Sequence, residues 1–246
     1  MTPRGEAEVL RAVAVCHRYR VPLTVRGGGT ENYGQAMPLR GGIVLDLSEL
    51  AAVKEIGHGR ARVEAGRKLA DLDAATIADS RQELRLHPST HKTGTIGGYV
   101  AGGSSGVGSV TWGLLRDRGN ILMARVVTME AEPRVLELRG ADVESVNHAY
   151  GTNGVITELE VPLAPAYRWA EAIVAFPDLM TAARCADALA REDAILKRLL
   201  TVVAAPVAHD YLFPERVASG ESIVILMVAD FALDALHDAF ALGPGG

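Results

Sequence analysis

The first third of the chain mixes the apolar spacings of helices with those of strands. Val9, Val13 and Cys16 recur every three or four residues, which is typical of one face of a helix. Val21-Pro22 then closes the helix, because the residue before proline avoids the helical conformation. The predicted elements are a helix over 6–20, strands over 23–25, 42–47 and 60–65, and a helix over 68–80.

The middle of the chain is expected to form a hairpin, a short helix and an alternating strand. The predicted elements are strands over 121–129 and 135–138, a helix over 141–147 and a strand over 154–161. The last of these is expected to place Val155, Leu159 and Val161 on one face and Ile156, Glu158 and Glu160 on the other. Pro162 and Pro165 are expected to end this strand, because proline cannot donate a ladder hydrogen bond.

We therefore place a domain boundary at 162–165, with a second unit that starts near Arg168. Its predicted elements are a strand over 169–176, a helix from Asp178, an irregular stretch, a strand over 223–229 and a helix over 231–242. Leu179, Ala183, Ala186 and Leu189 are expected to face inward on the first of these helices. Helices and strands do not alternate regularly, so the fold class is α+β.

Two glycine-rich runs carry the candidate chemistry. Arg26-Gly27-Gly28-Gly29-Thr30 directly follows the first predicted strand. Glycines have no Cβ to keep main-chain amides away from a bound oxygen, so this loop predicts a phosphate cradle. The second run covers 94–98 and 101–106, and it could approach the same ligand from another side. A tight turn would need one or two glycines, but rarely three beside an arginine.

Other glycine motifs do not match. The chain contains neither GxGxxG nor GxxxxGK[ST], which disfavours a Rossmann domain and a P-loop NTPase.

His87 and His91 stand four residues apart, but Pro88 lies between them and the segment is predicted to be a loop, so no metal site is expected. His148, Trp112, and the hydroxyls of Ser104 and Ser105 are each consistent with an ordinary structural role.

Composition narrows the class of protein. The 246 residues carry a formal net charge of −5 and are 48% apolar, which is ordinary for a globular chain and argues against nucleic-acid binding. Cys16 and Cys185 have no metal or CxxC spacing, so we expect a reducing, cytoplasmic location. The longest apolar run, 199–206, is too short to span a membrane.

Three motifs in order carry a family resemblance. They are Pro22–Thr30, Thr95–Gly98 and Gly151–Thr157, and the match covers about residues 6–163. Together they resemble the FAD-binding domain of the vanillyl-alcohol oxidase superfamily, also called the p-cresol methylhydroxylase (PCMH) type. Within it the chain is most similar to bacterial FAD-linked oxidases related to D-lactate dehydrogenase and the flavin subunit of glycolate oxidase.

The resemblance implies a domain plan and a set of cofactor-binding residues. It implies a PCMH-type FAD-binding domain over 1–163, with α+β subdomains over about 1–65 and 66–163, and a partial α+β substrate or cap domain over 166–246. The residues that it assigns to FAD are Arg26, Gly27, Gly28, Gly29, Thr30, Glu31, Asn32, Gly34, Pro88, Ser89, Thr95, Ile96, Gly97, Gly98, Gly102, Gly103, Ser104, Ser105 and Ile156. Thr30 stands where some members attach the flavin through histidine, so noncovalent FAD is expected. Tyr150 stands where the family often has an acidic residue.

The function that the resemblance implies is oxidation of a small 2-hydroxy acid, such as D-lactate or glycolate, by hydride transfer to flavin N5. The substrate groups of relatives lie largely in a part of the substrate domain that this chain does not match, so no catalytic residue is assigned. Two alternatives stay open. One is a noncatalytic FAD-binding module or subunit that depends on a partner chain or on a second copy; the other is a binder of another nucleotide diphosphate, such as a UDP-sugar or NAD.

Overall fold

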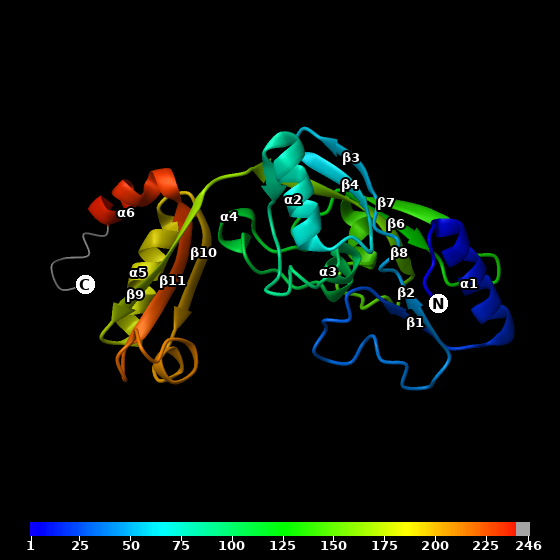
Figure 1. The fold of residues 1–246 in the computed structure, drawn as a ribbon, viewed down its shortest axis with the longest axis horizontal. Helices are drawn as coiled ribbons and strands as arrows, with labels where there is room; N and C mark the ends of the chain where they lie inside the picture. Colours follow the sequence, from blue (N-terminus) through cyan, green and yellow to red (C-terminus); the bar gives the residue numbers. More distant parts are fainter. Residues whose placement is uncertain (240–246) are drawn as a thin grey trace. The chain divides into compact units, whose positions relative to one another are not determined.

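The computed structural model describes residues 1–239, which form two compact units (Figure 1). The first unit contains residues 1–106 and 114–166, and the second contains 107–113 and the described part of 167–246. Both units combine helices with mainly antiparallel sheets, so the α+β prediction is confirmed.

The first unit begins with helix α1 (Glu6–Tyr19) and a two-stranded parallel sheet, β1 (Leu23–Arg26) and β2 (Ile43–Asp46). Its larger sheet has the order β3-β4-β8-β6-β7, with β5 also paired to β8. The strands of this sheet are β3 (Val53–Gly57), β4 (Arg60–Glu64), β5 (Gln82–Leu84), β6 (Met123–Val127), β7 (Val135–Arg139) and β8 (Val155–Pro165). Of these, β3 and β5 were not predicted from the sequence.

Two helices and a buried cluster cover one face of the larger sheet. Helices α2 (Leu69–Ser80) and α3 (Ile96–Gly102) supply apolar side chains to this cluster, as do β4, β6 and β8. A short 3-10 helix, η1 (Gly140–Ser145), lies where a helix was expected. A separate cluster joins α1 to β1, β2 and the ends of β6 and β8 through residues such as Val13, Leu45 and Val127. The residues predicted to bind the cofactor therefore lie on a packed scaffold.

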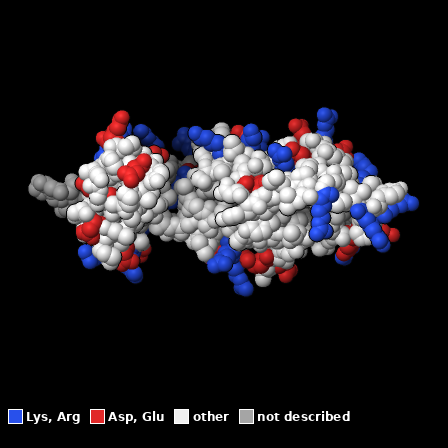
Figure 2. Space-filling model, turned by 90° about the horizontal axis from the view of Figure 1, so that it is seen from below, with Lys and Arg blue, Asp and Glu red and all other residues white. Residues whose placement is uncertain are grey.

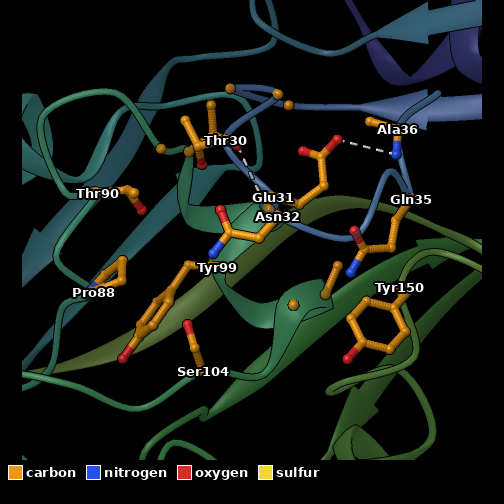
Figure 3. Close-up of a pocket in the computed structure, with 18 of the residues that line it drawn as sticks. Thr30, Glu31, Asn32, Gln35, Ala36, Pro88, Thr90, Tyr99, Ser104 and Tyr150 are labelled. Carbon is orange, nitrogen blue, oxygen red and sulfur yellow. Dashed lines mark hydrogen bonds between the residues drawn. The ribbon is translucent and has the colours of Figure 1, made fainter.

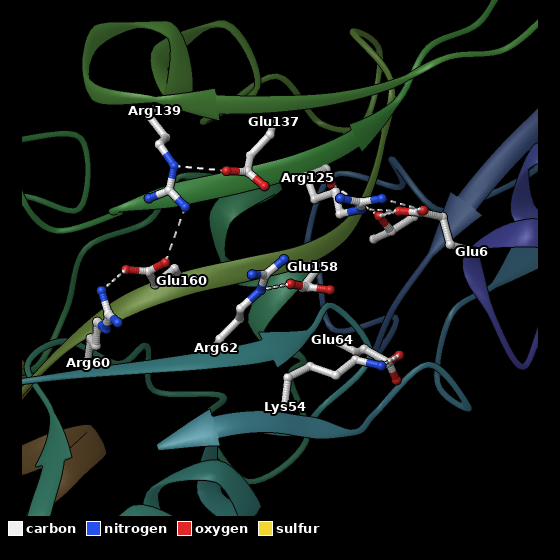
Figure 4. Close-up of polar contacts among 11 residues, drawn as sticks. Glu6, Lys54, Arg60, Arg62, Glu64, Arg125, Glu137, Arg139, Glu158 and Glu160 are labelled. Atoms are coloured by element: carbon white, nitrogen blue, oxygen red, sulfur yellow. Dashed lines mark hydrogen bonds and ion pairs between the residues drawn. The ribbon is translucent and has the colours of Figure 1, made fainter. Parts of the chain in front are cut away.

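The other face of the larger sheet carries charged side chains (Figure 4). Arg139 lies between Glu137 and Glu160, at 2.9 and 3.5 Å, and Arg60 also approaches Glu160, at 3.5 Å. Neighbouring pairs are Arg62 with Glu158 and Lys54 with Glu64. Isolated exposed ion pairs contribute little stability, so their main effect here is to keep this face polar. On the side of the molecule drawn in Figure 2, basic and acidic side chains are interspersed.

Strand β8 differs from its prediction in two ways. It continues through Pro162 to Pro165 rather than ending before them. Pro162 is tolerated because Leu163 N donates to Gly59 O at this point of the ladder, while on the other side the pairing with β6 ends at Glu160 and that with β5 begins at Leu163. No ladder hydrogen bond therefore requires an N–H at Pro162.

The second difference is a bulge in β8. Arg125 pairs with Glu158 but Val126 pairs with Ile156, so Thr157 is an extra residue. The bulge reverses the alternation: Ile156 joins the same buried cluster as Leu159, whereas Val155 packs with α1. The prediction that Val155 shares the face of Leu159 was therefore wrong.

The second unit contains a sheet of order β10-β11-β9, with all pairs antiparallel. Its elements are α4 (Ser109–Trp112), β9 (Trp169–Phe176), α5 (Leu179–Arg191), β10 (Lys197–Val203), the π-helix η2 (Ala208–Leu212), β11 (Ser222–Ala229), η3 (Asp230–Ala232) and α6 (Leu233–Ala239). Strand β10 falls in the stretch that was expected to be irregular. Helices α5 and α6 pack on this sheet through a buried cluster.

The predicted start of helix α5, Asp178, is its N-cap, and Asp178 Oδ1 accepts from Thr181 N at 2.9 Å. Its buried face is formed by Ala182, Ala186 and Leu189, whereas Leu179 is exposed, so the inward position predicted for Leu179 was wrong. The predicted end of the last helix, 240–242, lies outside the described residues.

Candidate functional site

The first glycine run forms the loop that follows β1. The connection from β1 to β2 spans residues 27–42 and includes turns closed by Met37 N to Gly34 O at 3.0 Å and by Ala36 N to Glu31 Oε1 at 3.2 Å. Figure 3 shows the Glu31 carboxylate reaching along the loop to Ala36. Gly34 therefore shapes a turn of this loop and does not line the pocket described next.

The two glycine runs meet at a pocket in the first unit. A Cβ at Gly28 would collide with the Thr93 carbonyl oxygen and lie 3.0 Å from Gly94 Cα. A Cβ at Gly97 would lie 2.6 Å from Ala65 Cβ, so α3 can approach the end of β4 only with glycine there. The pocket between the runs has a volume of about 310 Å³, which is at the lower end for ligand sites.

Twelve of the nineteen predicted residues line this pocket. They are Gly27, Gly28, Gly29, Thr30, Glu31, Asn32, Pro88, Ser89, Thr95, Gly98, Gly102 and Ser104. An adjoining cavity of about 60 Å³ is lined by Gly97 and Ile156, together with Gly27, Thr95 and Gly98. The structure thus brings segments from all three motifs together.

The other five predicted residues do not line either cavity. Ile96 is buried in the core, Gly103 ends α3, and Ser105 Oγ accepts from Leu115 N at 3.0 Å. Gly34 belongs to the turn described above. Arg26 is exposed, and its Nε lies 2.8 Å from where a Cβ on Gly29 would stand, so a cation lies beside the glycine loop.

The first loop leaves its main-chain donors open. Within residues 1–239, no hydrogen bond joins the N–H groups of Gly27–Asn32 to another protein group. Backbone donors rarely stay without a partner unless water or a ligand supplies one. Six consecutive donors at the pocket wall therefore suit the oxygens of an anionic group.

The second glycine run has a different role. Ile96 N and Gly97 N donate to Arg67 O and Ala65 O, at 2.9 and 2.8 Å, and Gly98 N donates to Thr95 Oγ1 at 3.3 Å. Because these amides are already used, the run serves chiefly to allow close packing of α3 against the sheet and the first loop.

Aromatic side chains complete the pocket, and sequence reasoning did not assign them to it. Tyr99 lines the pocket while being only 6% exposed, and its hydroxyl donates to Ser105 O at 3.3 Å. Burial raises the pKa of Tyr99, so the phenol stays neutral at physiological pH. Tyr150 lines both cavities. The further lining residues are Val25, Tyr33, Gln35, Ala36, Leu69, Thr90, Gly94 and Ala101.

The lining is nearly uncharged. Its only ionisable carboxylate is Glu31, and it includes no lysine, arginine, histidine or cysteine among the described residues. His87 and His91 stack with ring centroids 4.6 Å apart in the loop that carries Pro88–Thr90. No group of three or more potential metal ligands occurs within residues 1–239.

The fold and the open amides define a domain with a candidate site for an anionic ligand, and comparison with known proteins identifies its family. Residues 1–137 match the family model described as FAD binding domain. The chain belongs to this family, which confirms the predicted resemblance and supports FAD as its cofactor.

Similar proteins agree with that assignment. The chain is 34% identical over 173 residues to the glycolate oxidase subunit GlcD of Escherichia coli K12, an alignment that covers 66% of this chain and 34% of that subunit. It is 28% identical over 203 residues to a D-lactate dehydrogenase of Archaeoglobus fulgidus, covering 77% of this chain and 44% of that enzyme. Each alignment thus covers less than half the length of the relative.

A solved structure of alkyldihydroxyacetonephosphate synthase matches the fold with a TM-score of 0.78 and 19% identity, covering 98% of this chain and 51% of that one. This likeness supports the PCMH-type fold.

Within residues 1–239, no helix combines the length and apolar character that crossing a membrane requires.

Proposed function

We propose that the chain binds FAD without a covalent bond and forms the flavin-binding part of an oxidoreductase. The open amides of Gly27–Asn32 carry this proposal, because a diphosphate presents about two negative charges and several acceptor oxygens to such donors. Arg26, beside Gly29, adds a favourable charge without entering the pocket. Thr30 and the absence of histidine and cysteine from the described lining support noncovalent binding.

The proposed domain plan follows the same reasoning. Residues 1–163 would hold the cofactor, in subdomains over about 1–65 and 66–163, and residues 166–246 would form part of a substrate or cap domain. Every residue that lines the pocket belongs to the first unit. A cytoplasmic location is part of this proposal and is supported by two cysteines without a disulfide.

The proposed reaction is oxidation of a small 2-hydroxy acid such as D-lactate or glycolate. Relatives named glycolate oxidase subunit and D-lactate dehydrogenase support this substrate class. Bound FAD supplies the hydride acceptor for such an oxidation. The residues of this chain would bind and orient the cofactor, and the buried, neutral Tyr99 would help to keep water out.

One observation favours the alternative, a flavin-binding module that depends on a partner chain or on a second copy. The described pocket lining has no basic side chain to hold a substrate carboxylate. In this version the chain binds FAD, and another subunit supplies the carboxylate-binding groups.

A single experiment separates these possibilities. The purified protein is reconstituted with FAD, its visible spectrum is recorded under anaerobic conditions, and D-lactate and glycolate are then added. Bleaching of the flavin by either acid supports the oxidase proposal, whereas bound flavin that neither acid reduces supports the partner-dependent module. Failure to bind FAD, with tight binding of NAD or a UDP-sugar, contradicts both.

Acid precipitation tests the mode of attachment on the same sample. The proposal predicts that all of the flavin appears in the supernatant. Flavin that stays with the precipitated protein contradicts noncovalent binding.

A further inference from the structure

The segment that ends before the third motif contains two unusual backbone conformations. His148 and Tyr150 have φ of 57° and 52°, in the left-handed region that residues other than glycine seldom adopt. Such strain is held only where surrounding contacts fix the backbone, and it is common at ligand sites. The two left-handed residues are therefore candidates for a role in ligand binding.

Main-chain hydrogen bonds dock this turn on the last residues of α3. His148 N donates to Val100 O at 3.0 Å, and Tyr150 N donates to Ala101 O at 2.9 Å. Ala101 and its neighbours Tyr99 and Gly102 line the pocket. The turn thus joins the wall that faces the open-amide loop, and this placement brings the Tyr150 ring into the pocket lining (Figure 3).

The Tyr150 side chain is held by one contact that uses its hydroxyl. A hydrogen bond of 2.7 Å joins Tyr150 Oη to His148 Nε2, and the two rings lie edge to face with centroids 5.1 Å apart. Tyr150 is nevertheless 42% exposed. The contact with His148 fixes the orientation of the ring, so the face of the exposed ring is available to a ligand.

The surroundings of the ring favour a flat, weakly polar partner. Tyr150 lines both the main pocket and the adjoining cavity, where its neighbours include Val25, Leu47 and Ile156. No lysine, arginine or carboxylate lines that second cavity among the described residues. An aromatic ring of a bound nucleotide fits this environment, since stacking on tyrosine needs no charge and tolerates different bases.

We infer that Tyr150, fixed by His148, is the stacking platform for one aromatic ring of the bound dinucleotide. This inference rests on the proposed FAD site and adds a residue that positions the ligand. The ligand ring comes from either the adenine or the flavin half. The shared chemistry is a planar aromatic face, and the experiment distinguishes the two sources.

The experiment measures the dissociation constant of FAD by flavin fluorescence for the whole chain, with ADP and FMN as competitors. Tyr150→Asn removes the ring, and asparagine tolerates the left-handed backbone, so the fold is kept. Stacking on an aromatic side chain predicts that this variant binds FAD about tenfold more weakly. Tyr150→Phe keeps the ring and loses only the His148 contact, so its affinity should fall no more than about threefold.

The control is Tyr19→Ala, an exposed tyrosine on α1 that lines neither cavity, and it should bind FAD as the wild type does. Tyr150→Asn should also weaken only one of the two competitors, ADP or FMN, which identifies the stacked ring. Equal affinity of Tyr150→Asn and wild type for FAD overturns the inference. So does an equal loss in the Asn and Phe variants, an equal loss for ADP and FMN, or a loss for neither competitor.

The same measurements distinguish a failure of the proposed function from a failure of the stacking role. If the wild type itself does not bind FAD, the cofactor site is wrong, and the stacking role falls with it. If the wild type binds FAD and Tyr150→Asn binds it with equal affinity, only the stacking role is wrong.

Discussion

At the scale of single residues, the two glycine runs serve one pocket by different means. The amides of Gly27–Asn32 have no partner within the described chain, whereas those of 96–98 are bonded to Arg67, Ala65 and Thr95. The first run can therefore donate to a ligand, and the second chiefly permits close packing. A sequence pattern cannot separate these roles, because both depend on where the chain places other acceptors.

A substitution at Gly28 tests whether the two runs must meet for the cofactor to bind. In Gly28→Val the new side chain would collide with the backbone at Thr93 and Gly94. Relief of this collision requires the first loop to move away from the second, so FAD affinity should fall by about tenfold or more. The matched control is Gly57→Ala, whose Cβ meets nothing closer than 3.5 Å. Unchanged affinity in Gly28→Val would show that the contact between the runs is not needed.

Residue-level prediction reached the glycine loop but not the aromatic wall. Gly27–Thr30 were found because a turn after a strand rarely needs three consecutive glycines, whereas a phosphate cradle does. Glu31 and Asn32 were added by the family resemblance. Tyr99 and Tyr150 were missed as pocket residues because a tyrosine in sequence gives no sign of whether its ring faces a core, solvent or a ligand. Tyr150 is placed by a left-handed turn docked on α3. Neither position 148 nor position 150 is a glycine, so the sequence does not indicate this turn.

At the scale of elements, most strands and helices followed from apolar spacing, and the failures have physical causes. β8 passes through Pro162 because the ladder there needs no proline N–H. The bulge at Thr157 reverses the faces of Val155 and Ile156. Ile156 thereby lines the small cavity together with other residues predicted to bind the cofactor. Strand β10 was missed because a continuous apolar run lacks the alternation that marks a strand.

The same bulge anchors helix α1 to the sheet. Glu6 accepts from Arg125 Nε at 2.7 Å and Nη2 at 3.0 Å, and from Thr157 Oγ1 at 2.9 Å. The hydrogen bonds from Arg125 hold the pKa of Glu6 below its usual value of 4.5. This contact therefore stabilises the fold above that pH, and the stabilisation is lost as the pH falls through the lowered pKa.

Glu6→Gln tests this anchor. At neutral pH the variant should lose about 1 kcal/mol of unfolding free energy, because a partly exposed bidentate pair is worth about that much. The difference from wild type should shrink as the pH is lowered below 4.5. Urea unfolding at several pH values provides the measurement, with the exposed Glu49→Gln as control. A difference that stays constant across this pH range contradicts the role of the charge.

Thr95 caps helix α3 and contributes to the pocket wall. Its Oγ1 accepts from Gly98 N at 3.3 Å, and the residue is 3% exposed. Thr95→Ala should lower the unfolding free energy by about 1 kcal/mol, which is typical of a lost helix cap. Thr95→Ser keeps the oxygen and should restore most of that loss. Equal stability of the Ala and Ser variants in urea would mean that the cap hydrogen bond is not the cause.

At the scale of the whole molecule, the described chain divides its tasks between two units. All residues that line the pocket belong to the first unit, and the second unit has a core of its own. Membership of the FAD binding domain family rests on residues 1–137, which lie mainly in the first unit. The family could be recognised from sequence because its motifs fall in glycine-rich loops with strong backbone requirements.

A core substitution in the second unit tests this division. Val224 is 1% exposed beneath α5 and α6, so Val224→Ala should destabilise the second unit by about 2 kcal/mol. FAD affinity, measured at a temperature where the variant is fully folded, should not change. A weakened affinity under those conditions would mean that the second unit also contributes to cofactor binding.

The most direct test of the proposed cofactor site is hydrogen–deuterium exchange of the whole chain with and without FAD. We predict that FAD slows exchange at residues 27–32, whose amides gain acceptors, and that it changes exchange far less at 96–98, whose amides are already bonded. If FAD binds and leaves 27–32 unprotected, or protects only segments outside the pocket, the first glycine loop does not hold the diphosphate.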